Sequence, residues 1–157
     1  MKTAATGYIY LFTVIIIHIL TETVFAAAAT SNLIVSADVK SSCRITSVGD
    51  INFGAYDPLS ESPAYAAGNV VFRCVKGTSY KTYITGNRTM SGVSDSLTFG
   101  LYNEAGCETD FPSDHSVSAT EASNFNPITK DIYGQINPGQ DVGASSYTTT
   151  LVIVVEY

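Results

Sequence analysis

The segment T-L-V-I-V-V-E-Y, residues Thr150 to Tyr157, stands at the C-terminal end of the sequence. Its β-branched and aromatic residues predict a strand. From Tyr147 onward, one face of this strand carries Tyr147, Leu151, Ile153, Val155 and Tyr157, while Val152 and Val154 make the other face apolar too. As the last strand of a sheet, such a run would be an edge open to pairing with any other strand. We therefore expect this strand to need a partner strand, and both of its faces are apolar enough to be buried.

A second segment, residues 32–40, has the pattern that such an edge needs. Its alternating residues are Leu33, Val35, Ala37 and Val39 on one face and Ile34, Ser36, Asp38 and Lys40 on the other. Alternation of this kind predicts a strand with one apolar face. The segment precedes the first cysteine, so we expect it to lie outside the domain core and to pair with the C-terminal strand of another copy. Ile34 leaves open a slip by one residue, which would turn the other face inward.

The first 26 residues have the features of a secretory signal peptide. Lys2 precedes an apolar stretch over residues 8–20, and small residues follow at Ala26 and Ala28, either of which could mark the cleavage site. The alternative is a membrane anchor, but the stretch is well short of the roughly 20 residues that span a bilayer. We therefore expect export and no membrane span after cleavage.

The remaining part, about 130 residues, is long enough for one domain with its own core. Loss of Lys2 and Glu22 together leaves the net charge at −6, which argues against nucleic acid or an anionic membrane as a partner. Only 14% of the residues are charged, and Thr, Ser, Tyr, Val and Gly are frequent. This composition is typical of a β-protein with neutral polar faces.

Short β-rich segments separated by turn residues predict an all-β, antiparallel sandwich of seven or eight strands. The expected strands are residues 34–39, 43–47, 51–53, 69–75, 80–85, 97–102, 131–136 and 147–157. Gly, Asn and Pro between them supply turn conformations. Residues 109–127 are rich in Ser and Asp, and we expect one long loop there, or two loops around a weak strand.

Three cysteines follow the predicted signal, and export to an oxidising compartment favours a disulfide. Cys43 and Cys74 each lie in an expected strand, so we predict that they pair. Cys107 lies in a polar loop among carboxylates, where its pKa should be raised and a catalytic role is disfavoured. It is either a free or capped thiol or an intermolecular cross-link.

The sequence contains no pattern that predicts an enzyme, a cofactor or a metal site. After the signal there is one histidine, His115, beside Asp114 in a loop, without a nucleophile motif or a second histidine at metal-binding spacing. The acidic residues Glu104, Glu108, Asp110 and Asp114 lack the spacing of a calcium loop and are expected to be a solvated patch. Asn87-Arg88-Thr89 is a glycosylation sequon that matters only in a eukaryotic host.

Several motifs together resemble the spore coat protein U domain family, which includes subunits of Csu-type archaic chaperone-usher pili. They are Cys43, Phe53-Gly54-Ala55-Tyr56-Asp57-Pro58-Leu59, Val71-Phe72-Arg73-Cys74-Val75-Lys76-Gly77-Thr78, Arg88-Thr89-Met90, Leu97-Thr98-Phe99-Gly100-Leu101-Tyr102, Tyr133-Gly134-Gln135-Ile136 and the final strand after Tyr147. The resemblance extends over nearly all of the mature chain.

This resemblance implies an immunoglobulin-like sandwich that lacks its last strand and is completed by a donor strand. It also implies an apolar acceptor groove beside the C-terminal strand, lined either by the face with Tyr147, Leu151, Ile153, Val155 and Tyr157 or by the face with Val152 and Val154. It divides the chain into a signal (1–26), a donor extension (27–42) and a pilin-like domain (43–157). The implied partners are a periplasmic pilus chaperone, an outer-membrane usher and neighbouring pilin subunits, in a fimbrium at the cell surface that supports adhesion and biofilm formation. The alternative is a self-associating secreted spore coat or capsule protein of the same fold.

Overall fold

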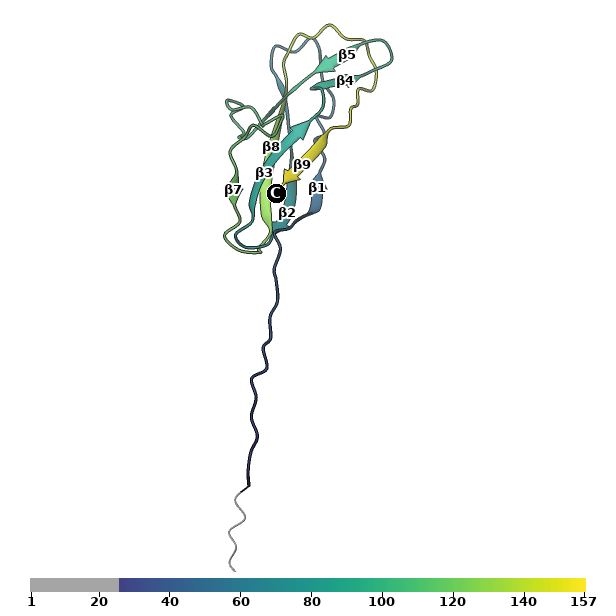
Figure 1. The fold of residues 1–157 in the computed structure, drawn as a ribbon. Coiled ribbons are helices and arrows are strands. Elements are labelled where there is room, and N and C mark those ends of the chain that lie inside the picture. Colours follow the sequence, from purple (N-terminus) through teal and green to yellow (C-terminus); the bar gives the residue numbers. More distant parts are fainter. Residues whose placement is uncertain (1–25) are drawn as a thin grey trace, which may run out of the picture. The chain divides into compact units, whose positions relative to one another are not determined.

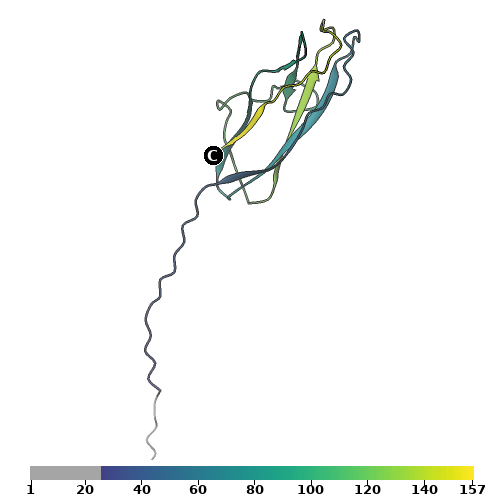
Figure 2. The same ribbon diagram turned by 90° about the vertical axis from the view of Figure 1, so that its right-hand side faces the viewer.

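Nine strands, all paired antiparallel, form the fold of residues 26–157, the part of the chain that the computed structural model describes (Figure 1). They are β1 (Cys43–Gly49), β2 (Ala64–Cys74), β3 (Ser79–Thr85), β4 (Thr89–Ser91), β5 (Ser96–Thr98), β6 (Gly100–Tyr102), β7 (Thr120–Glu121), β8 (Ile128–Ile136) and β9 (Val152–Glu156). One sheet has the order β1-β2-β8-β6, a second has the order β7-β3-β9, and β4 and β5 form a hairpin. Figure 2, turned by 90°, separates the two layers, with β9 in yellow on one side and β2 and β8 on the other.

Alternating side chains of the long strands make the interior between the two sheets. On β2, Val70, Phe72 and Cys74 are at most 3% exposed, whereas Arg73 between them is exposed. On β8, Ile132 and Ile136 are buried in the same way. Because successive side chains of a strand point to opposite faces, this period of two places one face of each strand in the core.

The buried side chains fall into two clusters. The first contains Ile84, Leu97, Phe99, Leu101, Phe111, Ile132 and Ile136, and the second contains Val70, Phe72, Cys74, Tyr80 and Ala122. Ile153 of β9 packs against both clusters. The predicted all-β antiparallel sandwich is confirmed.

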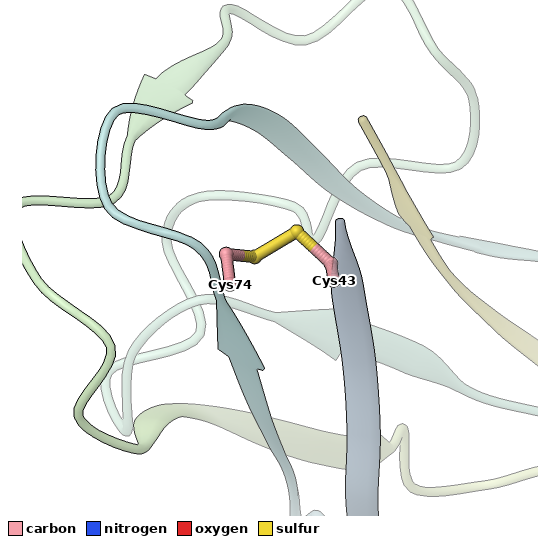
Figure 3. Close-up of a disulfide and its surroundings, with 2 residues drawn as sticks. All are labelled: Cys43 and Cys74. Atoms are coloured by element: carbon pink, nitrogen blue, oxygen red, sulfur yellow. A yellow bond between two sulfur atoms is a disulfide. The ribbon is translucent and has the colours of Figure 1, made fainter. Parts of the chain in front are cut away.

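The disulfide joins Cys43 and Cys74, as predicted (Figure 3). The two residues are opposite each other in the β1–β2 ladder, with Cα atoms 4.0 Å apart. The bond therefore fastens the first residue of the edge strand β1 to the last residue of β2, at one end of the sandwich.

Most predicted strands are present, with shifted bounds. The segment predicted over residues 97–102 is two strands, because its first part, β5, pairs with β4 and its second part, β6, pairs with β8. The two larger sheets together have seven strands, within the expected seven or eight, and the hairpin of β4 and β5 adds two more. β7 is the weak strand expected within residues 109–127.

Three predicted strands are absent or shortened. Residues 34–39 and 51–53 have no assigned secondary structure, and the strand expected over residues 147–157 begins only at Val152. The chain divides into two units, of which the second is Asp38–Tyr157. The boundary predicted at residue 43 remains a prediction.

The predicted signal peptide lies, except for Ala26, outside the described residues. Within residues 26–157 no helix has the length and apolar character needed to cross a bilayer.

Candidate functional site

Two of the four outer sheet edges are covered by neighbouring chain. Along β6, the amide of Phe111 donates to the Leu101 carbonyl at 2.8 Å, and Tyr102 forms a bridge with Asp110. Along β3, β7 pairs with its first residues and the Ile84 amide donates to the Pro112 carbonyl at 2.9 Å. Covered edges of this kind do not pair with other chains.

The other two edges, those of β1 and β9, have no ladder partner on their outer side in residues 26–157. They border one cavity of about 1230 Å³, which is lined by Val48 and Gly49 at the end of β1 and by Ile153 of β9. A packed domain rarely contains a void larger than a water molecule. The two uncovered edges therefore enclose an unfilled part of the core.

The floor of this cavity, which we call the groove, is the first core cluster. Six of its seven buried residues line the groove, namely Ile84, Leu97, Phe99, Leu101, Ile132 and Ile136. Met90 of β4 adds a flexible thioether side chain to the same surface. An occupant would therefore meet an almost wholly apolar floor, so burial of apolar side chains would supply most of its binding free energy.

The first wall of the groove is the segment that follows β1. Ile51, Phe53 and Tyr56 line the groove and pack against the first core cluster. Two glycines make room for the first two of these side chains: a Cβ on Gly134 would lie 2.7 Å from Phe53 Cζ, and a Cβ on Gly68 would lie 2.8 Å from Ile51 Cγ1. The segment thus crosses over the inner face of the four-stranded sheet instead of extending its edge.

The second wall is residues 141–153, which include both the start of β9 and the unpaired residues before it. The two β-rich segments that do not form their predicted strands, residues 51–53 and 147–151, are therefore opposite walls of the same groove. A strand needs a neighbour for its backbone groups. An extended segment placed between the walls would provide one to each.

The structure separates the five predicted acceptor residues into two groups. Tyr147, Leu151 and Ile153 line the groove. Val155 instead packs against the second core cluster, and Tyr157 is 60% exposed. The face that points inward is thus the one with Leu151, Ile153 and Val155, and Val152 on the opposite face is 58% exposed.

Some Cα atoms of β1 and β9 come within 8 Å of each other, although the two strands do not pair. A strand inserted between two others needs about 9.5 Å, twice the usual spacing of roughly 4.8 Å. Where the two edge strands come this close, an incoming strand does not fit between them.

The predicted donor residues are exposed on both faces of their segment. Leu33, Val35 and Val39 are 81–88% exposed, Ala37 is exposed, and Ile34 on the other face is 88% exposed. Apolar side chains at this exposure gain the full benefit of burial when they find a groove. The donor assignment and its register remain predictions.

Sequence reasoning missed the floor and the first wall of the groove. The alternation of residues 97–101 indicated burial but not the neighbour they would lack. Tyr56, quoted above only as part of a family motif, has a structural role: its hydroxyl donates to the Asn137 carbonyl at 2.9 Å and accepts from the Gln140 amide at 3.2 Å. It fastens the first wall to the loop that precedes the second.

Of the polar residues considered for catalysis or metal binding, Glu108, Asp110, Asp114 and His115 are exposed, and Glu104 is half-buried. The Asp114 carboxylate accepts from the Ser116 amide at 2.7 Å, and hydrogen bonds from Ser116 hold the pKa of Asp114 below its usual value. The His115 side chain is exposed, and its backbone carbonyl accepts from Lys81 Nζ. One Glu104 carboxylate oxygen accepts from the amides of Glu108 and Thr109. Among residues 26–157 no three metal-binding side chains are grouped.

Cys107 lies away from the groove, on the outer side of the four-stranded sheet. It has a left-handed backbone with φ of 54° and borders a hollow of about 320 Å³ with Tyr65 and Tyr133. Partial burial, with a smaller contribution from the Glu104 charge, raises the pKa of its thiol. At neutral pH the thiol is protonated, which makes it a poor nucleophile.

Similarities to known proteins identify the family to which this chain belongs. No curated protein matches the sequence. The fold is similar to a chain in the crystal structure of the CsuC–CsuE chaperone–tip adhesion subunit pre-assembly complex from the archaic chaperone-usher Csu pili of Acinetobacter baumannii, with a TM-score of 0.50 and 20% identity. The match covers 76% of this chain but only 40% of the other, so the two proteins share a fold over part of the longer chain. The family model of the Spore Coat Protein U domain matches residues 29–154. Since that match extends over most of the sequence, the chain belongs to the Spore Coat Protein U domain family.

Proposed function

We propose that the protein is a structural subunit of a secreted surface fibre of the archaic chaperone-usher type, assembled by strand donation between copies. The observation that carries this proposal is the groove. It has an apolar floor, it is bordered by the two uncovered sheet edges, and its walls contain two β-rich stretches, residues 51–53 and 149–151, that have no ladder partner. A folded domain with these features is complete only when an extended segment fills the groove.

The chain also carries a segment with the chemistry of such an occupant. Residues 32–40 alternate apolar and mostly polar side chains and are exposed. In strand addition, main-chain hydrogen bonds supply affinity while alternate side chains enter pockets and set the register. In the favoured register Leu33, Val35, Ala37 and Val39 face the floor of a neighbouring copy.

The partners follow from this mode of assembly. Before polymerisation an exposed apolar groove is an aggregation hazard, so a periplasmic chaperone would fill it first, and an outer-membrane usher would exchange that strand for the extension of the next subunit. The solved complex to which the fold is similar holds a chaperone and a tip adhesion subunit. The fibre would support adhesion and biofilm formation at the cell surface, which is a structural and not an enzymatic role.

The direct test adds a synthetic peptide of residues 32–40 to a variant that lacks residues 31–39 and cannot donate. We expect this variant to remain monomeric and to bind a pilus chaperone. Binding to the native state alone stabilises it by about 2.7 kcal/mol at a peptide concentration 100 times Kd. For a domain of this size, that corresponds to a rise in Tm on the order of 10 °C. Differential scanning calorimetry measures the shift.

Two single substitutions in the peptide are a matched pair. Val35→Asp places an unpaired charge in the apolar groove and should abolish the Tm shift. Ser36→Asp adds the same charge on the opposite face and should leave the shift almost unchanged. The reverse pattern would mean that the strand is bound one residue out of the favoured register.

Two outcomes would contradict the proposal. The first is polymerisation of the variant that lacks residues 31–39, which would show that this segment is not the donor. The second is a stable, monomeric protein that is indifferent to the peptide, which would favour a self-contained secreted coat protein of the same family.

A further inference from the structure

We infer that filling the groove also rigidifies the β4–β5 hairpin, so that a filled and an empty subunit differ at an exposed surface beside the groove. This inference rests on the proposed function, because it requires a strand in the groove. It concerns the effect of that strand on the conformation of the rest of the domain. Figure 1 shows the hairpin at the same end of the domain as residues 137–151.

The hairpin is a weak element by itself. Each of its strands has three residues, and it belongs to neither of the larger sheets. A two-stranded hairpin is at best marginally stable in water. Its tip is exposed, with Val93 at 90%. The hairpin therefore depends on its attachments to the rest of the domain.

The hairpin is attached to the Gln140 side chain, which makes three hydrogen bonds with Thr98, and to the second wall of the groove. The Ser91 amide donates to the Thr148 carbonyl at 3.0 Å, and the Thr148 amide donates back at 3.2 Å. Asp95 Oδ2 accepts from the Gly143 amide at 2.9 Å. Thr148 and Gly143 both line the groove.

Side chains reinforce this connection. A Cβ added to Gly92 would lie 2.5 Å from Tyr147 Cε1, so the Tyr147 ring packs directly on the Gly92 backbone. The Tyr147 hydroxyl donates to the Gly143 carbonyl at 2.7 Å. From the other side, Met90 and Leu97 of the hairpin reach the floor of the groove. The hairpin thus contacts both the wall and the floor that an occupant would touch.

Within the second wall, the chain between the Thr148 bridge and the first paired residue of β9 has no ladder partner. The β3–β9 ladder begins at Thr85–Val152, whereas the bridge to the hairpin is at Thr148, so residues 149–151 have no ladder partner. Gly86, with φ of 115°, turns the chain away from β9 after β3, and the Leu151 side chain packs against it. Backbone groups of residues 149–151 are therefore available to a new strand.

An occupant that pairs there would join Thr148 to Val152 in one continuous strand. Local opening is cheapest where few backbone hydrogen bonds hold the chain, and residues 149–151 are such a place. Once residues 149–151 are paired, the Ser91–Thr148 bridge is attached to an ordered strand. Local opening of the hairpin then costs more free energy. The groove and the hairpin are then coupled without any contact between the donor and the hairpin tip.

Amide hydrogen exchange tests the coupling in the full mature chain carrying Val35→Asp. In this variant the segment of residues 32–40 should not fill the groove of another copy, so the groove is empty before peptide is added. The probe is the wild-type peptide of residues 32–40 at saturation. We expect exchange at Ser91, Gly92 and Thr148 to slow at least tenfold. The internal reference is the Ala122 amide, which donates to the Thr78 carbonyl at 2.9 Å beside the even shorter strand β7 and does not line the groove. Its exchange should change less than twofold.

A second variant, Asp95→Ala, removes the acceptor of the Gly143 amide without altering a residue that lines the groove. In the empty protein its hairpin amides should exchange faster, and the peptide should slow them less than in the protein with Asp95. Peptide binding with unchanged exchange at Ser91 and Gly92, or with equal slowing at Ala122, overturns the inference and leaves the proposed function standing. Absence of peptide binding overturns the proposed function itself.

Discussion

Loss of the Cys43–Cys74 disulfide should remove a large share of the stability of this domain. The two cysteines are 31 positions apart. For a loop of that length the chain-entropy model gives about 3 to 4 kcal/mol, because the cross-link restricts the unfolded chain. Domains of this kind are stable by only about 5–15 kcal/mol in total. Reduction should therefore bring the protein close to its unfolding threshold.

The double substitution Cys43→Ala, Cys74→Ala should cost somewhat more than reduction alone. Cys74 is 3% exposed and packs in the second core cluster with Val70, Phe72 and Tyr80. Replacement of its sulfur leaves a small void beside these side chains, which adds about 1 kcal/mol. Without the disulfide, the edge strand β1 is attached to β2 only by the β1–β2 ladder, which has a bulge between Ile45 and Ser47.

Urea unfolding of the oxidised, reduced and doubly substituted proteins measures these differences. The chain has no tryptophan and ten tyrosines, so far-UV circular dichroism and tyrosine fluorescence are the suitable probes. With a slope of about 1–3 kcal/mol per M, the midpoint should fall by roughly 1–4 M. All samples contain the same saturating peptide of residues 32–40, so that each native state has a filled groove.

The matched control is Cys107→Ala, which alters a partly exposed thiol outside both core clusters and should change stability by less than about 0.5 kcal/mol. Two results would refute the reasoning. One is a loss below 1 kcal/mol on reduction, and the other is a Cys43–Cys107 linkage in non-reduced peptide maps.

Two further predictions concern the groove wall and alkaline pH. Leu151→Asp puts a charge on the inner side of the second wall and should weaken binding of the donor peptide at least tenfold. The side chain of Val152 is 58% exposed, so Val152→Asp should change the Kd less than threefold. Isothermal titration calorimetry measures both Kd values, and equal effects would contradict the assignment of the lining face. Burial raises the pKa of Tyr80 above its usual value near 10, so its contribution to stability is complete below about pH 10 and is lost as pH rises through the higher folded-state pKa. Urea midpoints from pH 8 to 11 should fall less steeply for Tyr80→Phe than for the unmodified protein, and parallel curves would show that another group dominates.

Much of the sandwich was predictable because its signals are local. The alternation in residues 69–75, 80–85 and 131–136 identified β2, β3 and β8, and the positions of Cys43 and Cys74 in two expected strands of an exported protein indicated the disulfide. Period-two burial is a property of each strand by itself. The grouping of Tyr147, Leu151 and Ile153 agrees with the groove that all three line, although β9 begins only at Val152, and the donor role of residues 32–40 remains a prediction.

The sequence by itself determined which segments of this protein have β-character and which of their faces are apolar. Only the tertiary structure decided which of those segments find a partner. Residues 51–53 and 149–151 have strand composition but no strand partner. Ile51 and Phe53 pack over Gly68 and Gly134, which leave room for them on the four-stranded sheet. At Gly86 the chain turns away from β9, so that Leu151 has no paired neighbour. The same packing buries Val155 in the second core cluster instead of the groove. The physical reason is that a side-chain pattern is fixed within a few residues, whereas a strand also needs hydrogen-bond partners, and these come from distant parts of the chain or from another copy.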